Sequence, residues 1–476
     1  MKLSYLKHSL KLIVFLISIT TFSQHELKNK VVDFVNLLPI ENASVYVQNT
    51  TIGTVTNADG KFVLLVPEEM AKDTLVISSI GFKSYKVPVD EFDNSFEVFL
   101  EEDVATLEEV VLNATPRPKT GDSIVLRALE RLDRNFPSQA YLQKGFLRHK
   151  ERNKKQFKWL IESAITVYDD TTYVNGETDN LKINVDEVRK SYDLRDVDSL
   201  FAYSTYLKYN ANVNLKPKNL RRDTIKTSSL VKAIKWNDTR VNGLEGLFKG
   251  KLNLVRNSKS PDALFGEDVL ATHKFRLDTI LVDNERKIYK IQIDKSREYV
   301  GLDTEGIFNE GYNAKGWIYI YWDNFAIKKI EYDLVAASPA QKTRSKRLFD
   351  TQTNHKLVIS YMEYQDKMYP NYIYYETPKL VNVGLKNDQN LTEEEQERYN
   401  KEERFYYTVQ EILFTEIILD EEKLSQVNTS NWDPDIFAKK PYHKSFWDSY
   451  NTLLESEEDE QLIKDLTKRS SLYNKN

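Results

Sequence analysis

Alternating apolar and polar positions, broken at short intervals by turn-forming residues, run from Lys28 to Leu100. Because successive side chains of a strand point to opposite faces, this period of two predicts strands with one buried face. The clearest case is Gly53 to Pro67, where β-forming residues flank the turn Asn57-Ala58-Asp59-Gly60. Short strands at near-regular spacing are typical of a β-sandwich, and we expect seven, at residues 30–35, 43–47, 53–55, 61–66, 74–79, 85–89 and 95–100.

The larger part of the chain, from Tyr141 to about Asp420, keeps a period of mostly two. Successive hairpins predict an antiparallel meander, which must curl or close to protect its edge strands. The expected hairpins are 273–281 with 287–295, 316–322 with 325–334 and 356–364 with 368–376, followed by a long strand at 404–419. The predicted fold class is therefore mainly β, a seven-stranded sandwich followed by a larger curled, half-barrel-like antiparallel sheet with flanking helices.

Two segments have the periodicity of helices instead. Asp122 is expected to cap a helix with an apolar stripe that indicates core packing, made of Ile124, Val125, Ala128, Leu129 and Leu132. A second apolar face near the C-terminus is expected to dock on the sheet, and it comprises Phe446, Trp447, Tyr450, Leu453, Leu454, Leu462, Ile463 and Leu466. Between them, the acid-rich segment 387–403 predicts a solvated helix or loop.

The N-terminus has the pattern of a secretory signal. Three lysines precede an apolar run at 12–19, and Thr21 and Ser23 are the small residues expected before a cut at Gln24. The run is short for a bilayer span, although an uncleaved anchor is the alternative. The predicted order is a signal peptide at 1–23, the sandwich at 24–112, a linker at 113–121, a helix plus β-meander body at 122–425 and C-terminal amphipathic helices at 426–476.

Composition narrows the class of protein. The 476 residues predict two or three domains, and a net charge of −5 argues against nucleic-acid binding. The chain has no cysteine, which excludes disulfides, thiolate metal sites and a lipid anchor attached to cysteine. No later stretch is apolar enough to span a membrane, so we expect a mature chain without a transmembrane helix, in the periplasm or associated with the outer membrane.

Residues 28–100 also resemble a known family, the carboxypeptidase-regulatory-like domain. The matching positions are Pro39, Ala43, Val45, Gly53, Thr54, Thr56, Asp59, Gly60, Phe62, Ile80, Gly81 and Tyr85. The segment 107–111 resembles the one that follows this domain in TonB-dependent receptors. The resemblance implies a non-catalytic, transthyretin-like sandwich. The rest of the chain resembles uncharacterised envelope proteins, and 316–332 is similar to a strand pair of periplasmic lipoprotein-carrier half-barrels.

Four residues are predicted to shape the turns of the sandwich. Gly60 is expected to take a positive φ at the hairpin that Gly53 opens, and Gly81 to bend the chain after a buried strand. Asp59 is expected to hydrogen-bond its own turn. A calcium ligand is the alternative for Asp59, but the partner carboxylates are missing.

Catalytic motifs are absent from the sequence. None of the six histidines is followed by glutamate at the spacing of a zinc carboxypeptidase, and the serine-hydrolase, Walker and dinucleotide-binding patterns fail. We therefore expect no catalytic residue, no metal and no cofactor. With 72 acidic residues, a carboxylate pair such as Asp303 and Glu305 arises by chance, yet a dispersed acidic site stays open.

Aromatic residues supply the candidate binding site. Ring faces stack on sugars, peptides or acyl chains, and the candidates are Trp317, Tyr319, Tyr321, Trp322, Tyr372 and Tyr374. A packed β core with tyrosines at its edge is the alternative.

These features favour a non-enzymatic binding or interaction protein of the cell envelope. Its partner would be an envelope protein, a glycan or a lipid. The alternatives are an envelope hydrolase with a dispersed carboxylate site, a lipid- or glycan-binding carrier associated with the outer membrane, and an integral outer-membrane barrel. The charged C-terminal segment argues against the last of these.

Overall fold

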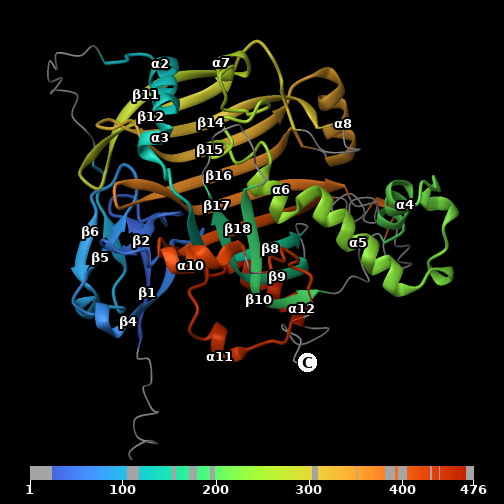
Figure 1. Ribbon diagram of the computed structural model, residues 1–476, viewed down its shortest axis with the longest axis horizontal. Helices are drawn as coiled ribbons and strands as arrows, with labels where there is room; N and C mark the ends of the chain where they lie inside the picture. The colour runs from blue at the N-terminus through green and yellow to red at the C-terminus, as the bar shows by residue number, and fades with distance from the viewer. Residues whose placement is uncertain are drawn as a thin grey trace, which may run out of the picture.

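The computed structural model describes residues 24–103, 117–152, 157–170, 180–192, 199–302, 309–349, 351–380, 392–394, 405–428, 431–438 and 440–467. Within these ranges the chain is mainly β, as predicted: a small sandwich lies beside an open antiparallel sheet of eleven strands, with helices around the sheet (Figure 1). The predicted signal peptide, part of the linker and most of the acidic segment 387–403 lie outside the described residues.

The sandwich has the seven predicted strands. They are β1 (Gln24–Asp33), β2 (Ser44–Val47), β3 (Gly53–Val55), β4 (Lys61–Pro67), β5 (Thr74–Ser78), β6 (Tyr85–Pro88) and β7 (Val98–Leu100). One sheet has the order β4-β1-β7 and the other β3-β2-β5-β6. Alternate residues of both sheets, among them Val31, Val45, Phe62 and Ile77, are buried between them, so the period of two read from the sequence is the period of this core.

The first strand begins six residues earlier than predicted and ends two residues earlier. It pairs with β4 through Lys30 and then with β7, in parallel, from Val31 to Asp33. The side chain of Asp33 accepts a hydrogen bond from the backbone amide of Val35 (2.7 Å), which turns the chain and ends the strand. Val35 is consequently exposed rather than paired.

The large sheet confirms the meander and its hairpins. Its path is β10-β9-β8-β18-β17-β16-β15-β14-β12-β11, and β13 pairs with β14. The strands are β8 (Tyr141–Arg152), β9 (Phe157–Asp169), β10 (Leu181–Tyr192), β11 (His273–Asp283), β12 (Arg286–Lys295), β13 (Val300–Gly301), β14 (Glu310–Tyr321), β15 (Ile327–Ala336), β16 (Thr353–Tyr364), β17 (Lys367–Leu380) and β18 (Phe405–Ile418).

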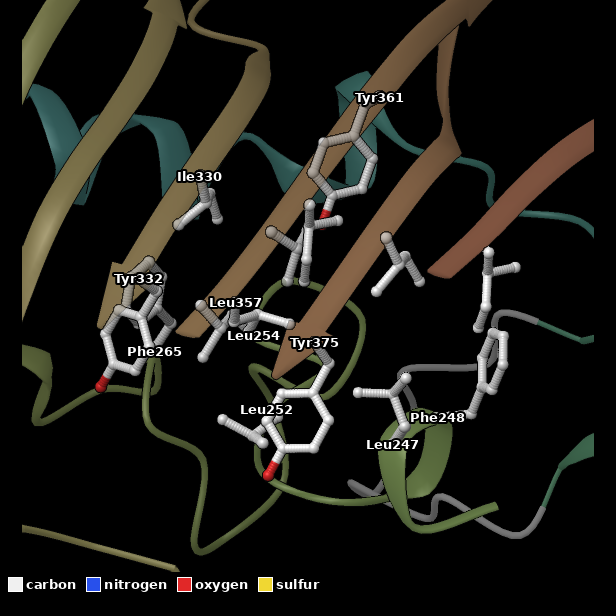
Figure 2. Packing of buried hydrophobic residues seen from close by; sticks show 14 of the residues in the cluster. Leu247, Phe248, Leu252, Leu254, Phe265, Ile330, Tyr332, Leu357, Tyr361 and Tyr375 are labelled. Carbon is white, nitrogen blue, oxygen red and sulfur yellow. The ribbon is translucent and has the colours of Figure 1, made fainter. Parts of the chain in front are cut away.

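One face of this sheet, which we call the core face, is apolar. Strand register places six isoleucines side by side across six strands, Ile291, Ile318, Ile330, Ile359, Ile373 and Ile412. All six are buried. Figure 2 shows Phe248, Leu252, Leu254 and Phe265, from the segment between β10 and β11, packed over this face.

The segment between β10 and β11 corrects the prediction of a continuous β body. It contains α4 (Ser199–Asn210), α5 (Thr227–Asn242), α6 (Leu244–Lys249) and α7 (Val269–Thr272). In α5 the buried positions Leu230, Ala233 and Ile234 have helical spacing. That short apolar stripe in a polar segment was the feature of the sequence from which a helix could have been predicted. In Figure 1, α6 crosses the large sheet, and α4 and α5 lie to its side.

The other helices are α2 (Gly121–Glu130), α3 (Leu132–Asn135), α8 (Pro339–Phe349), α10 (Glu421–Ser425), α11 (Lys444–Trp447) and α12 (Glu457–Thr467). In α2 the predicted stripe packs on the core face. Thr120 rather than Asp122 caps this helix, in a capping box with Ser123. Asp122 instead accepts a hydrogen bond from the backbone amide of Phe275 in β11 (2.7 Å), so it fixes the helix to the sheet.

The sandwich rests on the opposite face of the large sheet, which we call the cavity face. Val55 packs with Phe146 and Leu413 of that face, together with Trp447 and Leu453 from the C-terminal segment. At the other end, the Gly81 amide donates to the Val282 carbonyl (2.7 Å). The C-terminal segment therefore docks on the sheet as predicted, but much of it is irregular chain between α11 and α12. None of the helices in the described ranges is long and apolar enough to cross a membrane.

Candidate functional site

A cavity of about 570 Å³ lies between three parts of the chain. Its floor is the cavity face of the large sheet, one wall is the sandwich at 41–42 and 55–58, and another is the C-terminal segment at 453–459. We name residues 451–459 the strap.

Strand register brings the floor together from residues far apart in sequence. One row crosses eight strands and is aromatic at one end and charged at the other, in the order Trp317, Glu331, Val358, Tyr374, Glu411, Arg148, Glu162 and Arg189. On each strand, the residue of this row is the sequence neighbour of a residue in the row that contains the buried isoleucines. The two rows therefore face opposite sides of the sheet. The alternation that builds the core therefore also builds the site.

Three of the six predicted aromatic residues line this cavity: Trp317, Tyr372 and Tyr374. The ammonium of Lys290 lies 4.2 Å from the centre of the Trp317 ring. The Tyr374 hydroxyl donates to Glu376 (2.7 Å) and the Tyr372 hydroxyl to Glu411 (3.3 Å). Burial and the nearby carboxylates hold the pKa of both tyrosines above the ordinary value, so both stay neutral.

The other three predicted aromatics have contacts of a packed sheet instead. The hydroxyl of Tyr321 donates to Asp283 (2.6 Å), and the guanidinium of Arg286 lies over its ring. Tyr319 is 8% exposed. Trp322 lies beyond the end of β14, with the Arg117 guanidinium 3.4 Å from its ring centre. Tyr319, Tyr321 and Trp322 therefore have the contacts expected of the alternative, a packed β core.

Charged side chains make up much of the remaining lining. The cations are Lys150, Arg152, Lys329 and Lys356. The anions are Glu41, Glu331, Asp333, Glu411, Glu458 and Asp459. Burial raises the pKa of Asp333, which the nearby Lys356 opposes and Glu331 reinforces. The pair Asp303 and Glu305, named from the sequence, lies outside the described residues.

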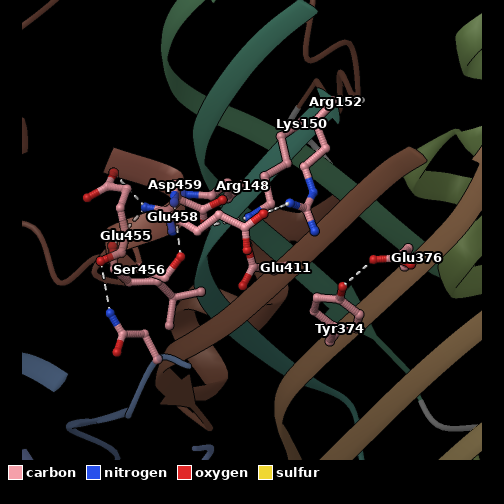
Figure 3. A network of polar contacts seen from close by, with 12 residues as sticks. Arg148, Lys150, Arg152, Tyr374, Glu376, Glu411, Glu455, Ser456, Glu458 and Asp459 are labelled. Atoms are coloured by element: carbon pink, nitrogen blue, oxygen red, sulfur yellow. Dashed lines mark hydrogen bonds and ion pairs between the residues drawn. The ribbon is translucent and has the colours of Figure 1, made fainter. Parts of the chain in front are cut away.

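An ion network joins the floor to the strap (Figure 3). Arg148 is 2% exposed and binds Glu162 of β9 (2.8 Å) as well as Glu455 of the strap (2.9 Å). Burial alone would lower the pKa of its guanidinium, but the carboxylates of Glu455 and Glu162 hold the pKa above its ordinary value. For Glu162, burial would raise the pKa, and Arg148 and Arg189 hold it below the ordinary value. The charged forms of Arg148 and Glu162 are therefore favoured. Burial raises the pKa of Glu455, an effect that Arg148 opposes and Glu162 reinforces.

The network was missed at the level of the sequence. Arg148, Lys150 and Arg152 occupy alternate positions of one strand, a visible signal for three cations on one face. Their strap partners lie about three hundred residues later in the chain, and no local pattern connects the two segments.

The strap also binds the turn of the sandwich. The Asn57 side chain, rather than that of Asp59, accepts from the turn amides of Asp59 and Lys61 (3.0 and 2.9 Å). Asp59 accepts instead from the amide of Glu457, the first residue of α12 (2.6 Å). The carboxylate predicted to hold its own hairpin therefore caps a helix of the strap region.

The predicted glycines have the expected geometry. Gly60 has φ = 73°, and a Cβ there would lie 2.4 Å from the Val31 carbonyl oxygen. Gly81 has φ = 91°. A Cβ on Gly53 would lie 2.9 Å from the Cβ of Tyr46, so the close approach of β2 and β3 needs glycine. In the part of the chain that the structure describes, no group of three or more histidine, aspartate or glutamate side chains is arranged to hold a metal ion.

The boundaries and core of the sandwich agree with a family match. Residues 28–112 match the CarboxypepD_reg-like domain. This confirms the resemblance found in the sequence. The CarboxypepD_reg-like domain accounts for the wall of the cavity at 41–42 and 55–58, and the remainder of the cavity is formed by parts of the chain outside the match.

Part of the chain is similar to a curated relative. The TonB-dependent receptor SusC of Bacteroides thetaiotaomicron is 33% identical over 106 residues, which are 22% of this chain and 10% of the receptor. The match therefore spans about a tenth of the receptor's length.

Solved structures resemble the chain only weakly. A LolA superfamily protein from Nitrosomonas europaea has a TM-score of 0.22 at 8% identity, covering 66% of this chain and 100% of that one. A DUF1329 family protein from Desulfovibrio piger has a TM-score of 0.23 at 9% identity, covering 64% of this chain and 94% of that one. Structural similarity this weak does not bear on function.

Proposed function

We propose that this chain is a non-enzymatic, exported protein of the cell envelope that binds a carbohydrate in the cavity between the sandwich, the sheet and the strap. One observation carries the proposal: Trp317, Tyr372 and Tyr374 line a cavity whose other side chains are mostly polar or charged. Its volume of about 570 Å³ is in the range of small-ligand sites.

The lining favours a sugar over an acyl chain. The C–H face of a sugar ring packs against an aromatic ring, and its hydroxyls hydrogen-bond to carboxylates, ammonium groups and amides. A buried acyl chain would remove water from ten charged side chains without giving them new partners, which is unfavourable. The cavity lining therefore favours a glycan over a lipid as the ligand.

The envelope location rests on separate support. The N-terminal sequence has the pattern of an export signal, and the chain contains no cysteine. Residues 28–112 match the CarboxypepD_reg-like domain, and 106 residues of the chain are similar to part of a TonB-dependent receptor. Periplasmic or outer-membrane association is the location that agrees with both.

Replacement of the aromatic platform tests the binding site. An array of neutral and acidic oligosaccharides identifies a binder, and calorimetry then compares the wild type with Trp317→Ala. We expect about fivefold weaker binding, since a ring contact contributes about 1 kcal/mol. Trp322→Ala is the matched control, because Trp322 stacks on Arg117 and does not line the cavity.

Two results would contradict carbohydrate binding. In one, no sugar on the array binds the folded protein while a fluorescent fatty acid binds it. In the other, Trp317→Ala and Trp322→Ala weaken sugar binding equally, which would place the ligand outside the cavity.

Hydrolysis of a glycan is a second candidate, because one observation favours it. Asp333 has a raised pKa and lies two residues from Glu331, and both line the cavity. An acid of raised pKa next to a second carboxylate is the arrangement of a glycosidase. A dispersed acidic site of this kind needs two acids in one pocket, and Asp333 is the candidate for the acid of raised pKa.

Product analysis separates the two candidates. For a binding protein we expect no new reducing ends after prolonged incubation with the sugar that binds. If reducing ends form, Asp333→Asn should lower their rate at least about 100-fold, as loss of a general acid does. Asp294→Asn, which removes an exposed partner of Arg276, should leave that rate unchanged.

A further inference from the structure

Three cations stand at alternate positions on the cavity face of β8. Arg148, Lys150 and Arg152 form what we call the basic ladder, and Figure 3 shows the three side chains directed toward the strap. Lys150 and Arg152 also line the cavity, together with Trp317, Tyr372 and Tyr374. The cationic and aromatic groups are therefore available to a single ligand.

The strap supplies one carboxylate to each cation of the basic ladder. Glu455 binds Arg148 (2.9 Å), Asp459 binds Lys150 (2.9 Å) and Glu458 binds Arg152 (3.1 Å). The sheet adds Glu162 next to Arg148, Glu411 next to Lys150 (3.2 Å) and the nearby charge of Glu376 at Arg152. Arg152 thus forms an ion pair with the strap, and Lys150 forms one with the strap and one with the sheet.

The outer part of the strap is held by contacts that a solute can replace. The carboxylate of Glu458 is 71% exposed, and Glu457 binds Lys61 of the sandwich with 71% of its own side chain exposed. Exposed ion pairs contribute little to stability. Leu453, by contrast, is buried against Trp447 and Phe146. The strap can therefore stay anchored at Leu453 while Glu458 moves away from Arg152. The Asp459–Lys150 pair is buried, with side chains 14% and 7% exposed, so Asp459 can leave only when a ligand carboxylate takes its place.

We propose that the cavity takes an anionic carbohydrate, a sugar bearing carboxylates, whose carboxylates replace Glu458 and Asp459 on Arg152 and Lys150. This inference rests on the proposed carbohydrate function and names the ligand class for that site. In the unliganded chain the acidic strap occupies the anion positions and competes with the ligand. The sugar rings lie against the Trp317 and Tyr374 side of the cavity. In the sheet order, Tyr374 on β17 is two strands from the cations of β8, and Trp317 on β14 is five.

Calorimetry with a matched pair of ligands tests the inference. The probes are trigalacturonate and the same trisaccharide with all three carboxyls methyl-esterified, so that only charge differs. We expect the acid to bind the full-length protein at least tenfold more tightly than the ester, and this preference to shrink in 0.5 M salt. Arg152→Gln should remove about tenfold of the affinity for the acid and leave affinity for the ester unchanged.

Strap variants test the competition itself. Glu458→Gln with Asp459→Asn should raise the affinity for the acid several-fold, since the competing carboxylates are gone. Glu460→Gln is the matched control, because Glu460 carries the same charge on α12 but does not line the cavity. Circular dichroism confirms that each variant is folded.

The outcomes separate this inference from the carbohydrate function. Equal affinity for acid and ester would overturn the anionic ligand and leave carbohydrate binding intact. An equal gain from Glu460→Gln and from the double variant would overturn displacement of the strap. If neither trisaccharide nor any array sugar binds the wild type or the strap variant, the carbohydrate function fails as well.

Discussion

Arg148→Met should lower the free energy of unfolding by about 3 kcal/mol, the loss measured when one partner of a buried ion pair is removed. Arg148 is 2% exposed and Glu162 is fully buried. Without the guanidinium, the Glu162 carboxylate keeps its ion pair with Arg189 (2.6 Å) but loses its ion pair with β8. The same change removes the hydrogen bond from Arg148 to the Leu453 carbonyl (2.8 Å) and so releases the strap.

Urea unfolding at neutral pH, followed by tryptophan fluorescence, measures this effect. Arg127→Met is the matched control, because Arg127 pairs with Glu130 on the exposed surface of α2. We expect that control to change stability by less than about 0.5 kcal/mol. Similar losses in both variants would show that the buried network contributes no more than a surface pair.

Acid should destabilise the protein steeply between pH 6.5 and pH 4 because of two buried histidines. Burial lowers the pKa of His273 to about 4 and that of His355 to about 3. The Nδ1–H of His273 donates to the Val269 carbonyl (3.1 Å), and its Nε2 accepts from the Tyr332 hydroxyl (2.8 Å). His355 lies next to the Tyr375 hydroxyl (2.9 Å) and near the charge of Arg344. Both rings are therefore kept neutral in the fold.

The direction follows from proton linkage. In the unfolded chain both histidines bind a proton as the pH falls below about 6.5, whereas the folded chain does not until about 4. The stability that the neutral rings contribute is complete above pH 6.5 and falls by about 1.4 kcal/mol per pH unit for each histidine. By pH 4 the loss is about 3 kcal/mol for each of them.

Denaturant unfolding at several pH values between 7 and 4 checks this prediction. His273→Gln and His355→Gln should each reduce the slope of stability against pH by about 1.4 kcal/mol per unit. His443→Gln is the control at an exposed histidine, whose side chain is 52% exposed. A slope unchanged in the two buried variants would mean that carboxylates alone cause the acid sensitivity.

The cavity was predictable only in part. The sequence identified Trp317, Tyr372 and Tyr374 because aromatic residues at alternate positions of a strand share a face. The same rule could not separate them from Tyr319 and Tyr321, since all five alternate correctly. The separation depends on which part of the face the sandwich and the strap leave uncovered, and that is a contact between segments far apart in the chain.

Asp59 shows the same limit at a single residue. Its place in an Asn-Ala-Asp-Gly turn predicts a local hydrogen bond, because short carboxylates commonly bind nearby amides. In the fold, Asn57 makes the local bonds and the Asp59 carboxylate reaches the amide of Glu457. Either side chain could accept the hydrogen bonds of the turn amides. The position of α12 next to the turn decides that Asn57 does so.

The sequence by itself determined the elements that depend on neighbouring residues. The seven strands of the sandwich, the hairpins of the large sheet, the apolar stripe of α2 and the positive φ of Gly60 follow from periodicity and from the backbone freedom of glycine. The tertiary structure alone decided the order of strands, the helical cover at 199–272 and the ion network of the strap. These arise because burial and charge pairing act between surfaces, and residues that meet across a surface have no fixed spacing in the sequence.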